Sequence, residues 1–122
     1  MPLEIQKSTD PKRPGVVTIK LIGSLDTATA PELEREMTQT LSERVNDLVF
    51  DLAQLKFVSS AGLRLFSVAR KQLVARGGRA SFINMQPQVE EVFAIIEKLP
   101  GFGLFKDLAA LDKYLDSRRS QT

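Results

Sequence analysis

The sequence predicts a single α/β domain in which a small mixed β-sheet of about four strands packs with about four α-helices, in the order ββαβαβαα. Short runs of branched apolar residues alternate along the chain with longer segments whose apolar residues recur at helical spacing. The 122 residues, 43% hydrophobic and 26% charged, suit one globular domain with a core of its own. We expect this domain to span residues 1–116 and to be followed by a polar tail at residues 117–122.

The first part of the chain predicts a hairpin and a helix. Residues 3–8 and 16–22 are rich in branched side chains, and turn formers at residues 9–15 join them, which favours two antiparallel strands. The next helix begins near Thr29, because the four residues from Thr29 to Glu32 carry the Ser/Thr-x-x-Glu capping pattern with a proline in the first turn. The apolar face of this helix is formed by Leu33, Met37 and Leu41.

The middle of the chain predicts a buried strand, a helix and another strand. Residues 47–52 have a continuous apolar centre, typical of a strand covered on both faces. Because a helix precedes this strand, its pairing with residues 16–22 should be parallel. Residues 61–75 form the next helix, which ends at Gly77-Gly78, and residues 79–84 form the strand that follows.

Two further helices complete the pattern. One begins at Pro87 and ends at residues 100–101. Its buried face is formed by Val89, Val92, Phe93 and Ile96. The other begins near Asp107, after residues 103–105. Its apolar residues are Leu108, Leu111 and Leu115.

The composition excludes several classes of function. Because the chain has no cysteine and no histidine, it lacks thiolate nucleophiles, the usual zinc ligands and the usual general base near neutral pH. We therefore expect no catalytic site, no metal site and no cofactor. Asp26 and Asp51 come from distant segments without a phosphate-binding glycine loop, which is a weak basis for a magnesium or nucleotide site.

Charge and hydropathy indicate the surroundings of the protein. The net charge of +2 arises from dispersed cations, which argues against a nucleic-acid or membrane surface. No stretch is long and apolar enough to span a membrane, and the start of the chain lacks the pattern of a secretion signal. We expect a cytoplasmic protein.

Ser59 and Ser60 lie where a predicted strand gives way to the helix at residues 61–75. A helix N-terminus has unpaired N–H donors and the positive end of the helix dipole, so a phosphate on a serine there would be stabilised. Arg64 lies one turn after Ser60 on the same side and would face such a phosphate. Serine is also among the best N-cap residues, so the spacing alone leaves capping and regulation both open.

One segment resembles the signature loop of anti-sigma factor antagonists, which are members of the STAS domain family: Phe57-Val58-Ser59-Ser60-Ala61-Gly62-Leu63-Arg64. The resemblance extends to residues 23–33, which are similar to the family's G-x-L-D loop and first helix, and to residues 48–52 and 103–105. It covers nearly the whole chain. It implies a single STAS domain, whose element order agrees with the one derived above.

The resemblance implies that the protein acts in partner switching. In that family, an anti-sigma factor that is also a serine kinase phosphorylates the serine just before the Ala/Ser-Gly-Leu step, which is Ser60 in this chain. The unphosphorylated form binds the anti-sigma factor and releases a sigma factor, phosphorylation abolishes the binding, and a serine phosphatase resets the cycle. Many members have an aspartate before the phosphoserine. This chain has Ser59 there, which makes Ser59 the alternative acceptor.

The same resemblance implies a partner-binding surface. Its residues are Asp26, Phe57, Ser59, Ser60, Gly62, Leu63 and Arg64. Asp26 is included because in related proteins its loop approaches the kinase contact. An aspartate at this position also suits a turn in which the carboxylate bonds its own backbone, with Thr27 and Thr29 nearby.

The remaining candidates have structural interpretations. Asp51 ends a buried strand, where a carboxylate most often accepts local backbone hydrogen bonds. Phe66, Phe82 and Phe93 fall on apolar patterns and should pack in the core, with Phe57 as the exposed exception.

Two other classes of function stay open on the sequence. In one, the STAS domain is a non-enzymatic scaffold subunit of a signalling assembly or an accessory of a lipid transporter, which large stable oligomers or co-purifying membrane proteins would favour. In the other, the chain binds or hydrolyses a nucleotide, against which the missing glycine loop counts. Our prediction is a non-enzymatic switch protein that is monomeric when free, although a sheet edge offers a pairing surface.

Overall fold

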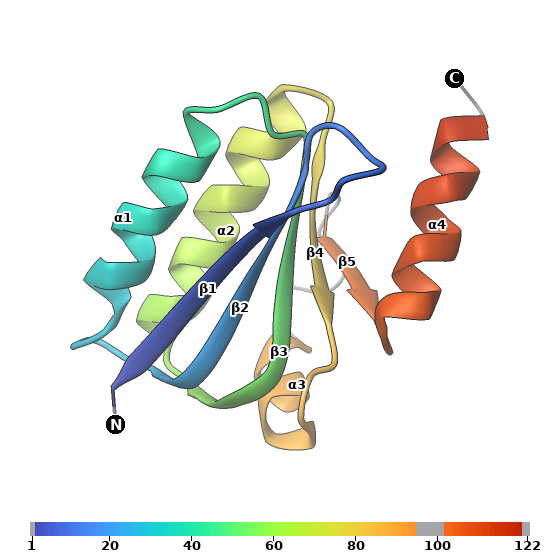
Figure 1. Ribbon diagram of the computed structural model, residues 1–122. Helices are drawn as coiled ribbons and strands as arrows, with labels where there is room; N and C mark the ends of the chain where they lie inside the picture. Colours follow the sequence, from blue (N-terminus) through green and yellow to red (C-terminus); the bar gives the residue numbers. More distant parts are fainter. Residues whose placement is uncertain (1, 95–101, 121–122) are drawn as a thin grey trace.

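The computed structural model describes residues 2–94 and 102–120, which form five strands and four helices (Figure 1). The elements in chain order are β1 (Leu3–Thr9), β2 (Val16–Leu25), α1 (Ala30–Leu41), β3 (Asp47–Val58), α2 (Ser60–Ala75), β4 (Arg79–Ile83), α3 (Pro87–Phe93), β5 (Phe102–Phe105) and α4 (Leu108–Ser120). The α/β class and the mixed sheet are as predicted. The sheet has one more strand than the about four expected, because the four-residue β5 pairs with β4.

The sheet has the order β1-β2-β3-β4-β5. β1 and β2 form the predicted antiparallel hairpin, with Leu3 opposite Gly23 and Thr9 opposite Val17. All other pairs are parallel, as expected for strands joined by crossover helices. The carboxyl ends of β2 to β5 therefore lie at the same end of the sheet, which is where functional loops gather in such folds.

The main core lies between one face of the sheet and α1, α2 and α3 (Figure 1). Four phenylalanines form its centre with ring centroids 4.8–5.5 Å apart: Phe50, Phe66, Phe82 and Phe93. All four are fully buried, which confirms the predicted core role of the last three. Phe57 is 51% exposed, as the sequence pattern indicated.

Helix α4 covers part of the opposite face of the sheet (Figure 1). Only Leu111 and Leu115 of this helix are buried among its described side chains, against a small cluster of Val16, Val49 and Ile83. The backbone of α4 continues to Ser120, into the segment predicted to be a polar tail. This helix is therefore held by much less apolar contact than α1 or α2.

Arg13 connects the β1–β2 loop to α4. Its guanidinium forms ion pairs with Asp10 at 3.0 Å, with Asp112 at 2.9 Å and with Asp116 at 2.8 Å. The arginine side chain is only 14% exposed. The three carboxylates raise the pKa of Arg13, chiefly through the hydrogen bond to Asp116, so it remains charged.

The ends of two helices test the predicted start and stop signals. Gly77 has φ +78° and Gly78 donates its N–H to the carbonyl of Leu73 at 2.7 Å, so the predicted glycine stop of α2 is confirmed. The predicted capping box of α1 is wrong, because the Thr29 side chain makes no cap hydrogen bond to the helix. Its hydroxyl bonds the preceding loop instead. Within the described residues, no helix combines the length and hydropathy needed to cross a membrane.

Candidate functional site

Two loops meet at the carboxyl ends of β2 and β3. The two strands pair in parallel up to their last residues, with Ser24 opposite Phe57 and Leu25 opposite Val58. The N–H of Ser59 then donates to the carbonyl of Leu25 at 2.8 Å. The loop that begins at Asp26 is thereby held beside the start of α2, two segments that are far apart in the sequence.

Ser59 and Ser60 occupy different positions at the start of α2. Ser59 is the N-cap, with extended backbone at φ −92° and ψ 174°, and its hydroxyl accepts a long hydrogen bond of 3.4 Å from the N–H of Gly62. Ser60 is the first residue of the helix and is exposed. Within the described part of the chain, the Ser60 hydroxyl has no hydrogen-bond partner. The two hydroxyls are therefore not equivalent: one caps the helix and the other faces solvent.

Gly62 is buried and contributes no side chain to the surface. A Cβ at this position would lie 2.7 Å from Leu25 Cγ and 2.8 Å from Val58 Cγ2. The glycine therefore lets the first turn of α2 approach the ends of β2 and β3 closely. Its burial gives Gly62 a packing role that sets the position of this surface, and the predicted contact of Gly62 with a partner stays a prediction.

The exposed part of the site is cationic and aromatic. Phe57 is 51% exposed and lies two residues before the N-cap serine. Arg64 is exposed one turn after Ser60 and has no ion pair within the described residues. Lys56 is exposed as well, whereas Leu63 is half-buried against the core. This surface can offer an apolar anchor and positive charge to another molecule.

The Asp26 carboxylate is used in its own loop. Its Oδ1 accepts hydrogen bonds from the N–H groups of Ala28 and Thr29, each at 3.0 Å. These bonds, first of all the one from Thr29, hold the pKa of Asp26 below its usual range. The turn predicted as the alternative interpretation is therefore present. The predicted contact role of Asp26 stays a prediction.

Asp51 has the structural role that was predicted for it. Its Oδ1 accepts hydrogen bonds from the N–H of Ala53 at 3.1 Å and from the side-chain amide of Asn84 at 3.2 Å. Asn84 has φ +60° and was not singled out from the sequence. In the residues that the structure describes, no group of three or more acidic side chains could hold a metal ion.

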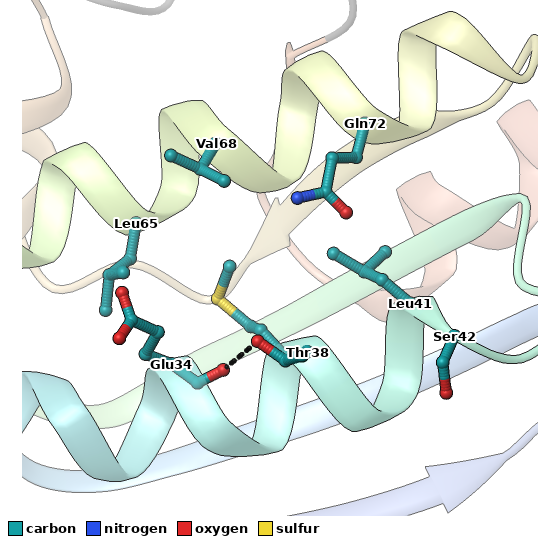
Figure 2. Close-up of a pocket in the computed structure, with 8 residues that line it drawn as sticks. Glu34, Thr38, Leu41, Ser42, Leu65, Val68 and Gln72 are labelled. Atoms are coloured by element: carbon teal, nitrogen blue, oxygen red, sulfur yellow. Dashed lines mark hydrogen bonds between the residues drawn. The ribbon is translucent and has the colours of Figure 1, made fainter.

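A groove of about 410 Å³ runs between α1 and α2, and its described lining residues include none of the residues 26–29 or 59–60 (Figure 2). Figure 2 shows Glu34 and Thr38 on the α1 side and Val68 and Gln72 on the α2 side, with Leu65 near Glu34. The Thr38 hydroxyl donates to the Glu34 carbonyl at 2.8 Å. Among the described residues that line the groove, Glu34 is the one ionisable residue.

Known proteins resemble this chain in both sequence and fold. The family model for the STAS domain matches residues 8–111. BtrV of Bordetella bronchiseptica, named as an anti-sigma factor antagonist, is 35% identical over 89 residues, which are 73% of this chain and 77% of that protein. The anti-sigma-B factor antagonist of Staphylococcus aureus is 27% identical over 95 residues, 78% of this chain and 85% of that protein.

The solved structures with this fold include one anti-sigma factor antagonist in two states. Unphosphorylated SpoIIAA has a TM-score of 0.72 at 20% identity, with 95% of this chain and 98% of that chain covered. Phosphorylated SpoIIAA of Bacillus has a TM-score of 0.70 at 21% identity, with 91% and 99% covered. At this identity, the likeness concerns the fold.

Proposed function

Because the chain belongs to the STAS domain family, we propose that it is an anti-sigma factor antagonist that acts by partner switching in the cytoplasm of a bacterium. The unphosphorylated chain binds an anti-sigma factor with serine kinase activity and so releases a sigma factor. Phosphorylation at Ser60 ends this binding, and a serine phosphatase restores it. The names of the relatives at 35% and 27% identity support this proposal. The chain itself performs no catalysis.

The observation that carries the proposal is the exposed hydroxyl of Ser60 at the first position of α2, beside Phe57 and the Asp26 loop. A kinase must reach the hydroxyl without unfolding the helix, and an exposed side chain permits this. Ser59 is the poorer acceptor, because it is half-buried and its oxygen already accepts from Gly62. Phosphorylation of Ser59 would place the phosphate on the oxygen that already accepts the cap hydrogen bond of α2.

The energetics of the phosphate favour a switch that leaves the fold intact. A phosphoserine carries about −1.5 to −2 charges at neutral pH. At Ser60 this charge lies at the positive end of the α2 dipole and one turn from Arg64, so it is stabilised within the domain. The two states of SpoIIAA resemble this chain with nearly equal TM-scores, in line with a phosphate that does not remodel the fold. The phosphate therefore acts on binding of the partner: it changes the local charge around Ser60 from positive to negative.

A binding experiment with paired serine variants tests the proposal. The chain is titrated with its anti-sigma factor by calorimetry before and after phosphorylation, and circular dichroism follows the secondary structure. We expect at least a hundredfold weaker binding after phosphorylation with an unchanged spectrum. Ser60→Ala should bind but resist phosphorylation, whereas Ser59→Ala should still be phosphorylated and lose about 1 kcal/mol of stability with its cap.

Three results would count against the proposal: phosphate on Ser59 instead of Ser60, equal affinity of both forms, or loss of secondary structure on phosphorylation. A large stable assembly that contains the chain in either state would favour the scaffold alternative.

A further inference from the structure

The Thr29 hydroxyl is buried between the end of β2 and the start of α1. Thr29 is only 8% exposed. Its Oγ1 accepts the N–H of Asp26 at 3.0 Å and donates its single proton to the Ser24 carbonyl at 2.8 Å, with Asp26 Oδ1 farther away at 3.2 Å. One hydroxyl therefore bonds both residues that flank Leu25 in the chain.

Leu25 connects this hydroxyl to the phosphorylation site. The Leu25 carbonyl accepts the N–H of Ser59 at 2.8 Å, and its fully buried side chain lies where Gly62 approaches β2. The segment from Ser24 to Asp26 thus meets α2 through the Leu25 carbonyl at the N-cap and through the Leu25 side chain at the first turn. A shift of this backbone would move the residue that precedes Ser60.

The Thr29 hydroxyl does not serve to cap α1. The Thr29 side chain makes no cap hydrogen bond, and the N–H of Ala30 is bonded by the Asp26 carbonyl at 2.8 Å. The N–H of Glu32 is bonded by the Thr29 carbonyl at 3.0 Å, a bond that any residue at this position could provide. The side chain therefore serves the loop rather than the helix.

We propose that Thr29 is a positioning residue for phosphorylation: its hydroxyl fixes residues 24–26, and through the Leu25 carbonyl it fixes the N-cap of α2 and the direction in which Ser60 faces a kinase. This inference rests on the proposed function of Ser60. Thr29 contacts neither Ser60 nor the phosphate in this arrangement. Its loss should lower the rate of phosphoryl transfer more than the affinity for the kinase, because the exposed Phe57 and Arg64 remain in place.

The test compares two buried threonines of the α1 region. Thr29→Val keeps the shape of the side chain and removes the hydroxyl, and Thr29→Ser restores the hydroxyl. Thr40→Val is the matched control, because Thr40 is fully buried in α1 and its hydroxyl donates to the Glu36 carbonyl at 2.8 Å, away from the site. Two quantities are measured: amide hydrogen exchange by NMR, and steady-state phosphorylation of Ser60 by the purified kinase that modifies the wild-type chain.

In Thr29→Val we expect at least tenfold faster exchange of the Asp26 and Ser59 amides. We also expect a kcat about tenfold lower, with KM changed less than threefold. Thr40→Val should leave both quantities as in the wild type, and Thr29→Ser should restore both. The inference is overturned if Thr29→Val behaves like Thr40→Val in exchange and in kcat.

Two further outcomes are decisive. If the wild-type chain is not phosphorylated at Ser60, the proposed function fails, and the exchange data still decide whether Thr29 holds the two loops together. If Thr29→Val does not fold, the proton of the Thr29 hydroxyl is observed by NMR in the wild-type chain at low temperature. The Thr29 hydroxyl proton should exchange with water far more slowly than the hydroxyl proton of the exposed Thr27, and equal rates would overturn the inference.

Discussion

Replacing Arg13 with methionine should destabilise the domain by loosening α4. Arg13 is the cation to which Asp10, Asp112 and Asp116 all bond, and two of these carboxylates belong to α4. The methionine side chain keeps much of the apolar stem and removes the charge and all three ion pairs. Because the described apolar contacts of α4 centre on a small cluster, the loss should fall mainly on this helix.

The size of the effect follows from the exposure of each partner. Asp112 and Asp116 are 45% and 64% exposed, so each of these pairs contributes only about 0.5 kcal/mol. The pair with Asp10 is better shielded, at 14% and 22% exposure, and a charged hydrogen bond of this kind contributes roughly 1–2 kcal/mol. The free energy of unfolding should therefore fall by about 2 kcal/mol, which lowers the Tm of a chain of this size by about 8 °C.

Thermal and urea unfolding followed by circular dichroism measure this loss, and hydrogen exchange locates it. Amides of α4 should exchange faster in Arg13→Met, with a smaller change in β3. Arg35→Met is the matched control, because Arg35 is exposed and forms no ion pair in the described residues, and it should change stability by less than about 0.5 kcal/mol. A Tm of Arg13→Met within 2 °C of the wild type would show that the ion pairs of Arg13 do not hold α4 in place.

Three further predictions concern the site. Phe57→Ala should weaken anti-sigma factor binding at least tenfold in calorimetry without lowering Tm, because an exposed interface anchor contributes to binding and not to folding. Leu108→Ala removes a similarly exposed apolar side chain on α4 and should leave the binding unchanged. Equal losses of affinity in the two variants would contradict the role of Phe57. Gly62→Ala should lower the free energy of unfolding measured in urea, because overpacking against Leu25 costs about 1–3 kcal/mol and the gain in helix propensity is at most about 1 kcal/mol. An increase in stability would contradict the close approach of the first turn of α2 to Leu25. Hydrogen bonds to the carboxylate lower the pKa of Asp26 in the folded chain, so the stability that this carboxylate adds is present above its unfolded pKa of about 3.9 and is lost as the pH falls through the lower folded pKa. Acid unfolding of Asp26→Asn should lack this part of the pH dependence. Identical pH profiles of the variant and the wild type would contradict this prediction.

The sequence predicted the elements whose ends carry strong local signals. Pro31 and Pro87 lie in the first turns of α1 and α3, and Gly77 ends α2 with the positive φ that favours glycine. β5 was not predicted, because four residues are too few to show a periodicity. β3 was predicted to end at residue 52 and continues to Val58, because its pairing with β2 is carried on through two register shifts, which no local pattern reveals.

The candidate site was predicted in part. Exposure of Phe57 and the helix-start position of the two serines followed from pattern and capping chemistry. The role of Thr29 was missed, because its local sequence matches a capping box while its hydroxyl bonds the preceding loop. Burial of Gly62 was missed for a similar reason: the contact with Leu25 joins segments that are distant in the sequence. Local signals find the residues of the site, and tertiary pairing decides what each of them does.

The most direct test of the proposed switch is an intact-mass measurement with phosphosite mapping on the chain purified from its native host, with Ser60→Ala expressed in parallel. We expect one phosphate on Ser60 in part of the wild-type population and none in Ser60→Ala, even though Ser59 is still present. An unmodified wild-type chain across growth and stress conditions, or a phosphate that persists in Ser60→Ala, would show that Ser60 is not the switch.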